Sequence, residues 1–288
     1  MTSAAVSASP RRKSRVRLSL ARWAPIALII AFILAAIFAP LIAPYDPNAQ
    51  NLLGRMKSPG TLSRSFHYLL GSDELGRDLL SRLIYGARVS LFVAFSSVIL
   101  SGVVGVLVGM LAGYLRGLVE VIIMRLVDVF LSIPAILLAI ITVAVLGPGL
   151  MNVIVVLALT RWPRYARIAY GQTLSVANMP FVRLAAFMGA SAPRILLRHI
   201  LPNIIGAVTV VATLEFGLMV LFEAGLSFLG LGVQPPTASW GAMLSSGRNY
   251  LATAWWIATF PGLCLFLLVL AVNLIGDDLR DRFDPRSH

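Results

Sequence analysis

The sequence has few of the residues with which soluble enzymes do chemistry. Cys264 is the single cysteine among 288 residues, which excludes a disulfide framework and a thiol-rich metal site. The three histidines, His67, His199 and His288, lie far apart in the chain. No HExxH, Walker A or GxSxG motif is present. We therefore expect this chain to hold no catalytic residues, no metal and no cofactor of its own, and not to be an enzyme.

Charge is also scarce. Charged residues make up 12% of the chain and hydrophobic residues 58%, whereas a soluble domain has about 25% charged residues. The apolar residues form six continuous blocks, each long enough for a bilayer, which takes about 20 residues. These blocks are Ala24–Ala43, Ser90–Gly113, Val127–Leu146, Leu150–Tyr170, Ile204–Phe222 and Ala254–Ile275. Continuous apolar runs favour helices over barrel strands, so we predict an all-α polytopic membrane protein with six transmembrane helices.

The first block could instead be a cleaved signal peptide, because it follows a basic N-terminus. Its length of about 20 residues exceeds a typical signal core, and the segment Ala39–Pro44 is a poor cleavage site. We interpret it as a permanent anchor.

The distribution of arginine predicts the orientation. Cations cluster before the first block and in the segment Arg161–Asn203, which has no acidic residue. Cytoplasmic loops are rich in such residues, so both termini are predicted to be cytoplasmic. The predicted order is a basic tail (1–23), the first helix (24–43), an extracytoplasmic segment (44–88) with an interfacial helix within Asp73–Arg88, a membrane core (89–276) and a tail (277–288). The net charge of +12 is then a topology signal, and no nucleic-acid partner is expected.

The segment between the fourth and fifth blocks predicts a helix–turn–helix. The first helix is expected over Asn178–Gly189, with Asn178 as its cap. The second is expected to begin at Ser191 and to end at Pro202. Small side chains that let another surface approach closely occur at Ala185, Ala186 and Gly189. The residues alone leave two interpretations open: a docking surface for a soluble partner, or an amphipathic connector on anionic lipid.

The same segment resembles the cytoplasmic signature loop of binding-protein-dependent ABC importer permeases. Arg183-Leu184-Ala185 is followed at the family's spacing by Gly189 and then by Leu201-Pro202. Arg183 stands where the family has glutamate and His199 where it has an aliphatic residue, as in the peptide and nickel branch. The resemblance implies an ATPase-coupling loop that comprises Phe181, Arg183, Ala185, Ala186, Gly189, Ala190, Ser191, His199, Leu201 and Pro202.

Further tracts extend the resemblance from about residue 24 to the C-terminus. They include His67–Leu91, Glu223–Gly232 and Asn273–Asp281. The resemblance implies a type I ABC importer transmembrane fold in a bacterial cytoplasmic membrane, and a second permease subunit that takes up dipeptides or oligopeptides by alternating access. It also implies a heterodimer with a homologous permease, two cytoplasmic ATPase domains that bind ATP and magnesium, and an extracytoplasmic substrate-binding protein.

Two alternatives to this function stay open. One is a permease for nickel or haem within the same branch. The other, from a different class, is an autonomous channel or secondary transporter, which would predict buried charged pairs in the spans and no docking loop.

Several single residues carry narrower predictions. Glu215 either lines the pore and meets a peptide's amino group, or is a buried carboxylate hydrogen-bonded to a neighbouring helix. Glu223 is expected to accept bonds from backbone amides of the Gly225–Gly232 loop, and Asp128 to pair with Arg125 on one helix face.

Small and aromatic residues give two further expectations. Glycines recur at small-residue spacing on the second span, at Gly102, Gly105, Gly109 and Gly113. They predict close helix packing within one subunit or, alternatively, between subunits. Interfacial anchoring is predicted for Trp240, Trp255 and Trp256.

Overall fold

The computed structural model describes residues 15–62 and 67–283, which are helical apart from loops and one short hairpin. The hairpin pairs β1 (Thr61–Leu62) antiparallel to β2 (His67–Tyr68). The predicted all-α class is confirmed. The helices are α1 (Arg15–Ile37), α2 (Ala39–Ile42), α3 (Leu79–Leu115), α4 (Gly117–Ser132), α5 (Ala135–Leu146), α6 (Leu150–Ala177), α7 (Pro180–Phe187), α8 (Ala192–Ile195), α9 (Leu201–Phe228), α10 (Trp240–Gly247) and α11 (Trp256–Phe283).

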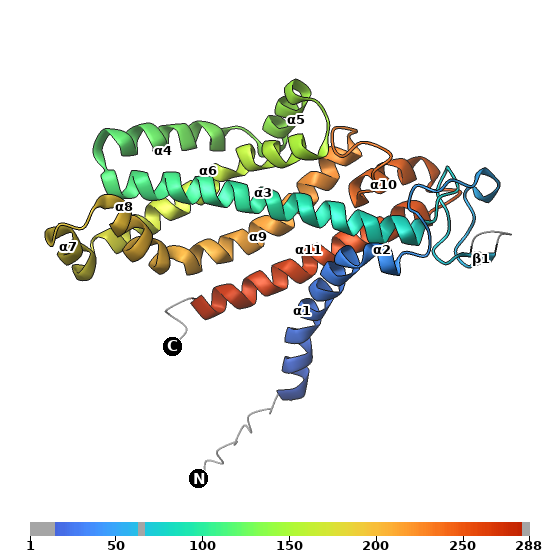
Figure 1. The fold of residues 1–288 in the computed structure, drawn as a ribbon, viewed down its shortest axis with the longest axis horizontal. Coiled ribbons are helices and arrows are strands. Elements are labelled where there is room, and N and C mark those ends of the chain that lie inside the picture. Colours follow the sequence, from blue (N-terminus) through green and yellow to red (C-terminus); the bar gives the residue numbers. More distant parts are fainter. Residues whose placement is uncertain (1–14, 63–66, 284–288) are drawn as a thin grey trace, which may run out of the picture.

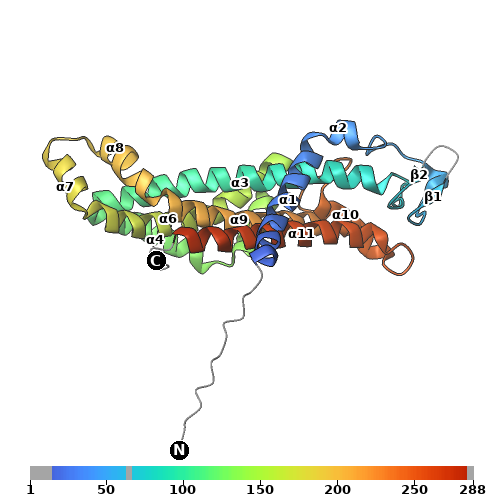
Figure 2. The ribbon, with the colours of Figure 1, turned by 90° about the horizontal axis from the view of Figure 1, so that it is seen from below.

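The molecule is elongated along its longest helices (Figure 1). α3 packs against both α6 and α9, and α9 also packs against α11. α4 and α5 lie on one side of this group, whereas α1 crosses α3 and α11 on the other (Figure 1). Figure 2 shows α7 and α8 at one end of the molecule and α2 with the hairpin toward the other. We call these the α7 end and the hairpin end.

Three helical stretches of the described residues are each long and apolar enough to cross a bilayer, namely α3, Ala192–Phe228 and α11. The predicted third span differs from a simple helix, because it is divided between α4 and α5, which meet at 92°. Pro134 lies at the break and the preceding Ile133 is extended, as proline requires of its neighbour. With α1, α6 and this bent pair, the arrangement is compatible with six spans.

The predicted interfacial helix within Asp73–Arg88 is wrong. α3 begins at Leu79 and continues without a break to Leu115, so the residues up to Arg88 are its first turns. Asp78 caps it, because its carboxylate accepts a hydrogen bond from the Ser81 amide at 2.8 Å. Burial raises the pKa of the Asp78 carboxyl, against the effect of its bonds to Ser81.

The glycine face of α3 packs within the chain. A β-carbon at Gly105 would overlap the carbonyl oxygen of Trp162, and one at Gly109 would overlap that of Ala166, both on α6. The contact therefore needs glycine because the two backbones touch. The prediction of packing inside one subunit is confirmed.

Two of the three tryptophans predicted as interfacial anchors are core residues. Trp240 is buried and its indole N–H donates to the Leu83 carbonyl at 2.9 Å. Trp256 is also buried and donates to the Ser72 carbonyl at 3.1 Å. Both tie distant parts of the hairpin end together, whereas Trp255 is exposed.

The outward faces of the helices are apolar. Phe95 on α3, Ile141 on α5 and Phe266 on α11 are all exposed, as are many other large apolar side chains. Apolar surface of this extent is typical of contact with lipid.

Candidate functional site

The α7 end presents a cluster of exposed apolar side chains. Phe187 is 91% exposed and Met188 is 78% exposed, and Phe181 and Leu184 are exposed beside them. We call these four residues the α7 patch. An apolar patch at the tip of a helical loop is a typical protein-contact surface.

The opposite side of this loop is anchored in the molecule. Val182 of α7 is buried, and so are Ile195 and Ile200 of the segment that follows it. They share one apolar cluster with Val176 near the end of α6. The loop is therefore held by buried contacts on one side while the α7 patch stays open on the other.

The turn between α7 and α8 depends on Gly189. Its φ of +84° is in the left-handed region, and no atom lies within 4 Å of where a β-carbon would stand. The backbone conformation, and not the lack of space, therefore favours glycine at this position. Within this chain, the space beside Gly189 is open to a partner.

The predicted cap of α7 is wrong. Met179 occupies the N-cap position, and Asn178 instead donates to the Leu174 carbonyl and accepts from Arg183 at 2.9 Å. Asn178 thus belongs to the end of α6, whose last turn it closes. Ser191 does occupy the N-cap position of α8, but its side chain makes no capping bond.

Pro202 does not end the second helix, contrary to prediction. The chain passes from α8 through a π-helical turn at Leu196–Ile200 into α9, with Pro202 in the first turn of α9. Proline has no N–H for the carbonyl four residues before it. The wider turn, in which the Leu201 N–H bonds to the Leu196 carbonyl, accommodates that loss. One continuous helical rod therefore joins the loop to the membrane helix.

The predicted loop residues lie on α7, in the turn between α7 and α8, on the π-helical turn and in the first turn of α9. Arg183 and Ala186 are exposed, as are Phe181, Gly189 and Ser191, whereas Ala185, Ala190, His199 and Leu201 are partly buried. The loop geometry agrees with a docking surface, and its role in coupling stays a prediction.

A buried ion cluster links α6 to α9. The Glu215 carboxylate is 1% exposed, and its two oxygens face Nε of Arg161 at 2.7 Å and Nε of Arg164 at 3.3 Å. The Arg161 guanidinium also lies over the ring of Phe222, 5.1 Å from its centre. The geometry matches the second interpretation of Glu215, a buried carboxylate bonded to a neighbouring helix. A direct pore role for Glu215 stays a prediction.

Three arginines of this region lie on one helix. Arg161, Arg164 and Arg167 belong both to the predicted span Leu150–Tyr170 and to the segment Arg161–Asn203 that is predicted to be cytoplasmic, and all three lie within α6. Arg167 pairs with Asp128 of α4, which replaces the predicted pair of Asp128 with Arg125.

Glu223 is fully buried near the hairpin end. It accepts hydrogen bonds from the hydroxyls of Ser90 at 3.0 Å and Ser227 at 2.8 Å. The prediction that it bonds backbone amides is wrong. The Ser227 hydroxyl in turn accepts from the Val233 amide, so Glu223 holds the loop after α9 against α3 through hydroxyl groups.

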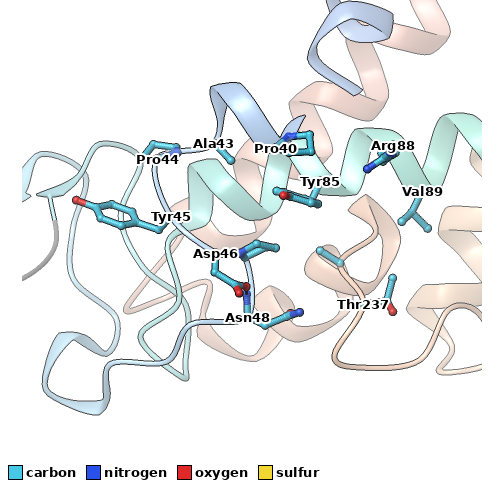
Figure 3. Close-up of a pocket in the computed structure, with 12 residues that line it drawn as sticks. Pro40, Ala43, Pro44, Tyr45, Asp46, Asn48, Tyr85, Arg88, Val89 and Thr237 are labelled. Atoms are coloured by element: carbon cyan, nitrogen blue, oxygen red, sulfur yellow. Dashed lines mark hydrogen bonds between the residues drawn. The ribbon is translucent and has the colours of Figure 1, made fainter. Parts of the chain in front are cut away.

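A cavity of about 560 Å³ opens at the hairpin end. Figure 3 shows its walls, which are the loop that carries Asp46 and Asn48, α3 with Tyr85 and Arg88, and the loop that carries Thr237. The first loop is tied to α3 because Arg82 donates to the Pro47 carbonyl at 3.1 Å. The lining combines charged, hydroxyl and proline side chains, which suits a polar ligand or a protein segment.

Comparisons with known proteins fit this geometry. Residues 105–288 match the family described as the binding-protein-dependent transport system inner membrane component. The chain belongs to this permease family. Residues 23–59 also match the N-terminal transmembrane domain of oligopeptide transport permease C. The protein is therefore a multi-pass component of the inner membrane.

Individual relatives of this permease are peptide transport proteins by name. The di/tripeptide transport system permease protein DppC of Pseudomonas aeruginosa is 44% identical over 90% of this chain and 85% of its own length. The probable D,D-dipeptide transport system permease protein DdpC of Escherichia coli is 40% identical over 90% of this chain and 86% of its own. A solved structure of the inward-facing MetNI methionine ABC transporter superposes with a TM-score of 0.56 and 22% identity, over 72% of this chain and 98% of that chain. That likeness supports the type I importer fold.

Sequence reasoning missed the arginine partners of Glu215 in this permease. The signal was available in part, since Arg161 and Arg164 are one turn apart within the predicted span Leu150–Tyr170. Two cations inside a span need a carboxylate or water beside them, and Glu215 is a carboxylate in the next span.

Proposed function

We propose that this chain is a transmembrane permease subunit of an ATP-driven importer for dipeptides or oligopeptides. The α7 patch carries the proposal. It is an exposed apolar surface on a loop that is anchored to α6 and continuous with α9. A force applied to such a loop moves the membrane helices, which is what alternating access requires. The peptide names of the relatives support the substrate class.

The proposed complex has four kinds of component. A homologous second permease completes the path across the membrane as a heterodimer, and two ATPase domains act from the cytoplasm, one of them docked on the α7 patch. These ATPases bind ATP and magnesium, so this chain is not itself an enzyme and needs no cofactor. Both termini are then cytoplasmic, and an extracytoplasmic binding protein delivers the substrate.

The cavity in Figure 3 is the proposed contact for the binding protein. It lies at the hairpin end, opposite the α7 patch along the long axis (Figure 2). A docking site there puts substrate delivery and energy supply on the two faces of the membrane. Arg88 on its rim is exposed and suits an acidic group on that partner.

Uptake by the reconstituted complex tests the proposed function. Proteoliposomes with both permeases and the ATPases, supplied with binding protein and internal ATP, are expected to accumulate labelled dipeptide and to ignore nickel and haem. Accumulation of nickel or haem without accumulation of dipeptide would show that the substrate is nickel or haem and not a peptide. Uptake of peptide by this chain alone, without ATP, would indicate a channel or secondary transporter.

Two substitutions in the loop refine this test. Gly189→Asp and Arg183→Glu are each expected to lower uptake at least about tenfold, equal to ~1.4 kcal/mol, because both put a negative charge where the ATPase docks. Gly189→Asn is the matched control, since asparagine tolerates a positive φ about as well as aspartate does. Wild-type uptake by both charged variants would contradict docking at this loop.

A further inference from the structure

The ion cluster between α6 and α9 has one cation more than it needs. Glu215 carries one negative charge, and Arg161 alone, at 2.7 Å, neutralises it. Arg164 adds a second guanidinium 3.3 Å from the other oxygen. The cluster therefore has a net charge of +1 between two membrane helices.

The burial of the three side chains is unequal. Glu215 is 1% exposed and Arg161 is 11% exposed, whereas the Arg164 side chain is 55% exposed. The excess positive charge is thus on the arginine at the surface of the chain. Glu215 and Arg161 form the buried ion pair that holds Arg164 in place.

Arg164 is also far from both ends of its helix. With about 1.5 Å of rise per residue, it lies about 20 Å from each end of α6. An exposed guanidinium within a membrane-spanning helix is costly against hydrocarbon, and such residues usually face a water-filled path or the interior of a bundle. This side chain therefore marks the face of α6 and α9 that borders the transport path.

The free part of the Arg164 guanidinium sets the ligand chemistry. Its closest approach to Glu215 is through Nε, which lies 3.3 Å from a carboxylate oxygen, so the N–H groups of the two terminal nitrogens remain for a ligand. These nitrogens form a planar fork that binds a carboxylate through two parallel hydrogen bonds. Every unmodified peptide carries one such carboxylate at its C-terminus, whatever its side chains.

We propose that Arg164 binds the C-terminal carboxylate of the peptide in transit, with Glu215 and Arg161 as positioning residues. The inference rests on the proposed function and names a substrate contact within it. It explains how one path can pass peptides of many sequences, because the contact recognises the one group that these substrates share.

The test compares alanyl-alanine with its C-terminal amide in the reconstituted complex. Uptake is measured at equal amounts of peptide-loaded binding protein, with the loading of each peptide determined by calorimetry. The variants are Arg164→Gln, Arg164→Lys and, as a matched control, Arg167→Gln. Arg167 is on the same helix, is also paired with a carboxylate and is similarly exposed, at 50%. Arg164→Gln leaves the buried pair of Arg161 and Glu215 balanced, so it is expected to fold.

We expect Arg164→Gln to lower uptake of the free dipeptide about tenfold and to leave uptake of the amide unchanged. Arg164→Lys is expected to retain part of the preference, and Arg167→Gln all of it. A second measurement does not need the binding protein: modification of Arg164 by phenylglyoxal, located by mass spectrometry, is expected to be slowed by millimolar alanyl-alanine and not by the amide.

Other outcomes have distinct meanings. Equal effects of Arg164→Gln on both peptides, no effect on either, or loss of the assembled complex would each overturn the inference, the last by making Arg164 a subunit contact. In all three cases the wild-type complex still imports dipeptide. A wild-type complex that imports no peptide would instead defeat the proposed function, and the inference with it.

Discussion

Replacing Gly109 with alanine is expected to destabilise the protein by about 1–3 kcal/mol, although alanine is the better helix former. The added β-carbon would overlap the backbone carbonyl of Ala166 on α6. A backbone atom cannot move aside by a change of rotamer, so α3 and α6 must separate along their whole contact. The midpoint of thermal unfolding in detergent, followed by size-exclusion chromatography, measures the effect.

Gly102 provides a matched control on the same helix. A β-carbon there would meet the ring of Tyr165 at 3.6 Å, which is an ordinary van der Waals contact. Gly102→Ala is therefore expected to keep or raise stability, by up to about 1 kcal/mol from helix propensity. Equal midpoints for the two variants would show that backbone contact does not set the distance between α3 and α6.

Replacing Glu215 with glutamine is expected to have the largest effect in the ion cluster, a loss of about 3–5 kcal/mol. The change leaves Arg161 buried without a counter-charge and beside a second arginine. The predicted result is a large drop in the amount of folded chain in the membrane, read from the monodisperse peak of the purified complex.

A double substitution separates charge from shape. Arg161→Gln with Glu215→Gln removes both buried charges and keeps the net charge of +1 at Arg164. It is expected to recover most of the stability that Glu215→Gln loses, because the two sites are directly coupled. A double variant no more stable than the single one would contradict the account of the cluster. Unchanged uptake and substrate range in a folded Glu215→Gln variant would in addition exclude a direct pore role for Glu215.

The long apolar helices could be predicted from the sequence because their pattern is local. α3 has an apolar stretch that no charge interrupts, and its glycines indicated the face that touches α6. The bend between α4 and α5 was missed although Pro134 stood inside the run. Hydropathy is summed over a window, so one proline does not change it, while the same proline changes the backbone direction.

The ion cluster could not be predicted in full, since its partners are far apart in the chain. Arg161 and Glu215 are separated by 54 residues, and a single sequence does not show which spans are neighbours. Arginine usually marks a cytoplasmic loop, and that rule assigned Arg161 to the cytoplasmic segment although it also lies in the predicted span Leu150–Tyr170. In the structure, a counter-charge on α9 makes a buried arginine tolerable.

The tryptophans show the same limit. Trp240 and Trp256 lie near helix ends, where aromatic residues often contact the membrane surface. Their indole N–H groups instead reach the carbonyls of Leu83 and Ser72, which are distant in the sequence. Tertiary partners decided their environment, and their position along the chain did not reveal those partners.

The central claim is that ATPases drive uptake by docking on the α7 patch. The substitution Phe187→Asp tests this claim most directly. Phe187 is 91% exposed, so the substitution is expected to leave the fold of this chain unchanged. In proteoliposomes with all subunits, the account predicts that it lowers both dipeptide uptake and the ATP hydrolysis stimulated by loaded binding protein at least about tenfold. Wild-type uptake and wild-type stimulated hydrolysis in the Phe187→Asp complex would contradict the account.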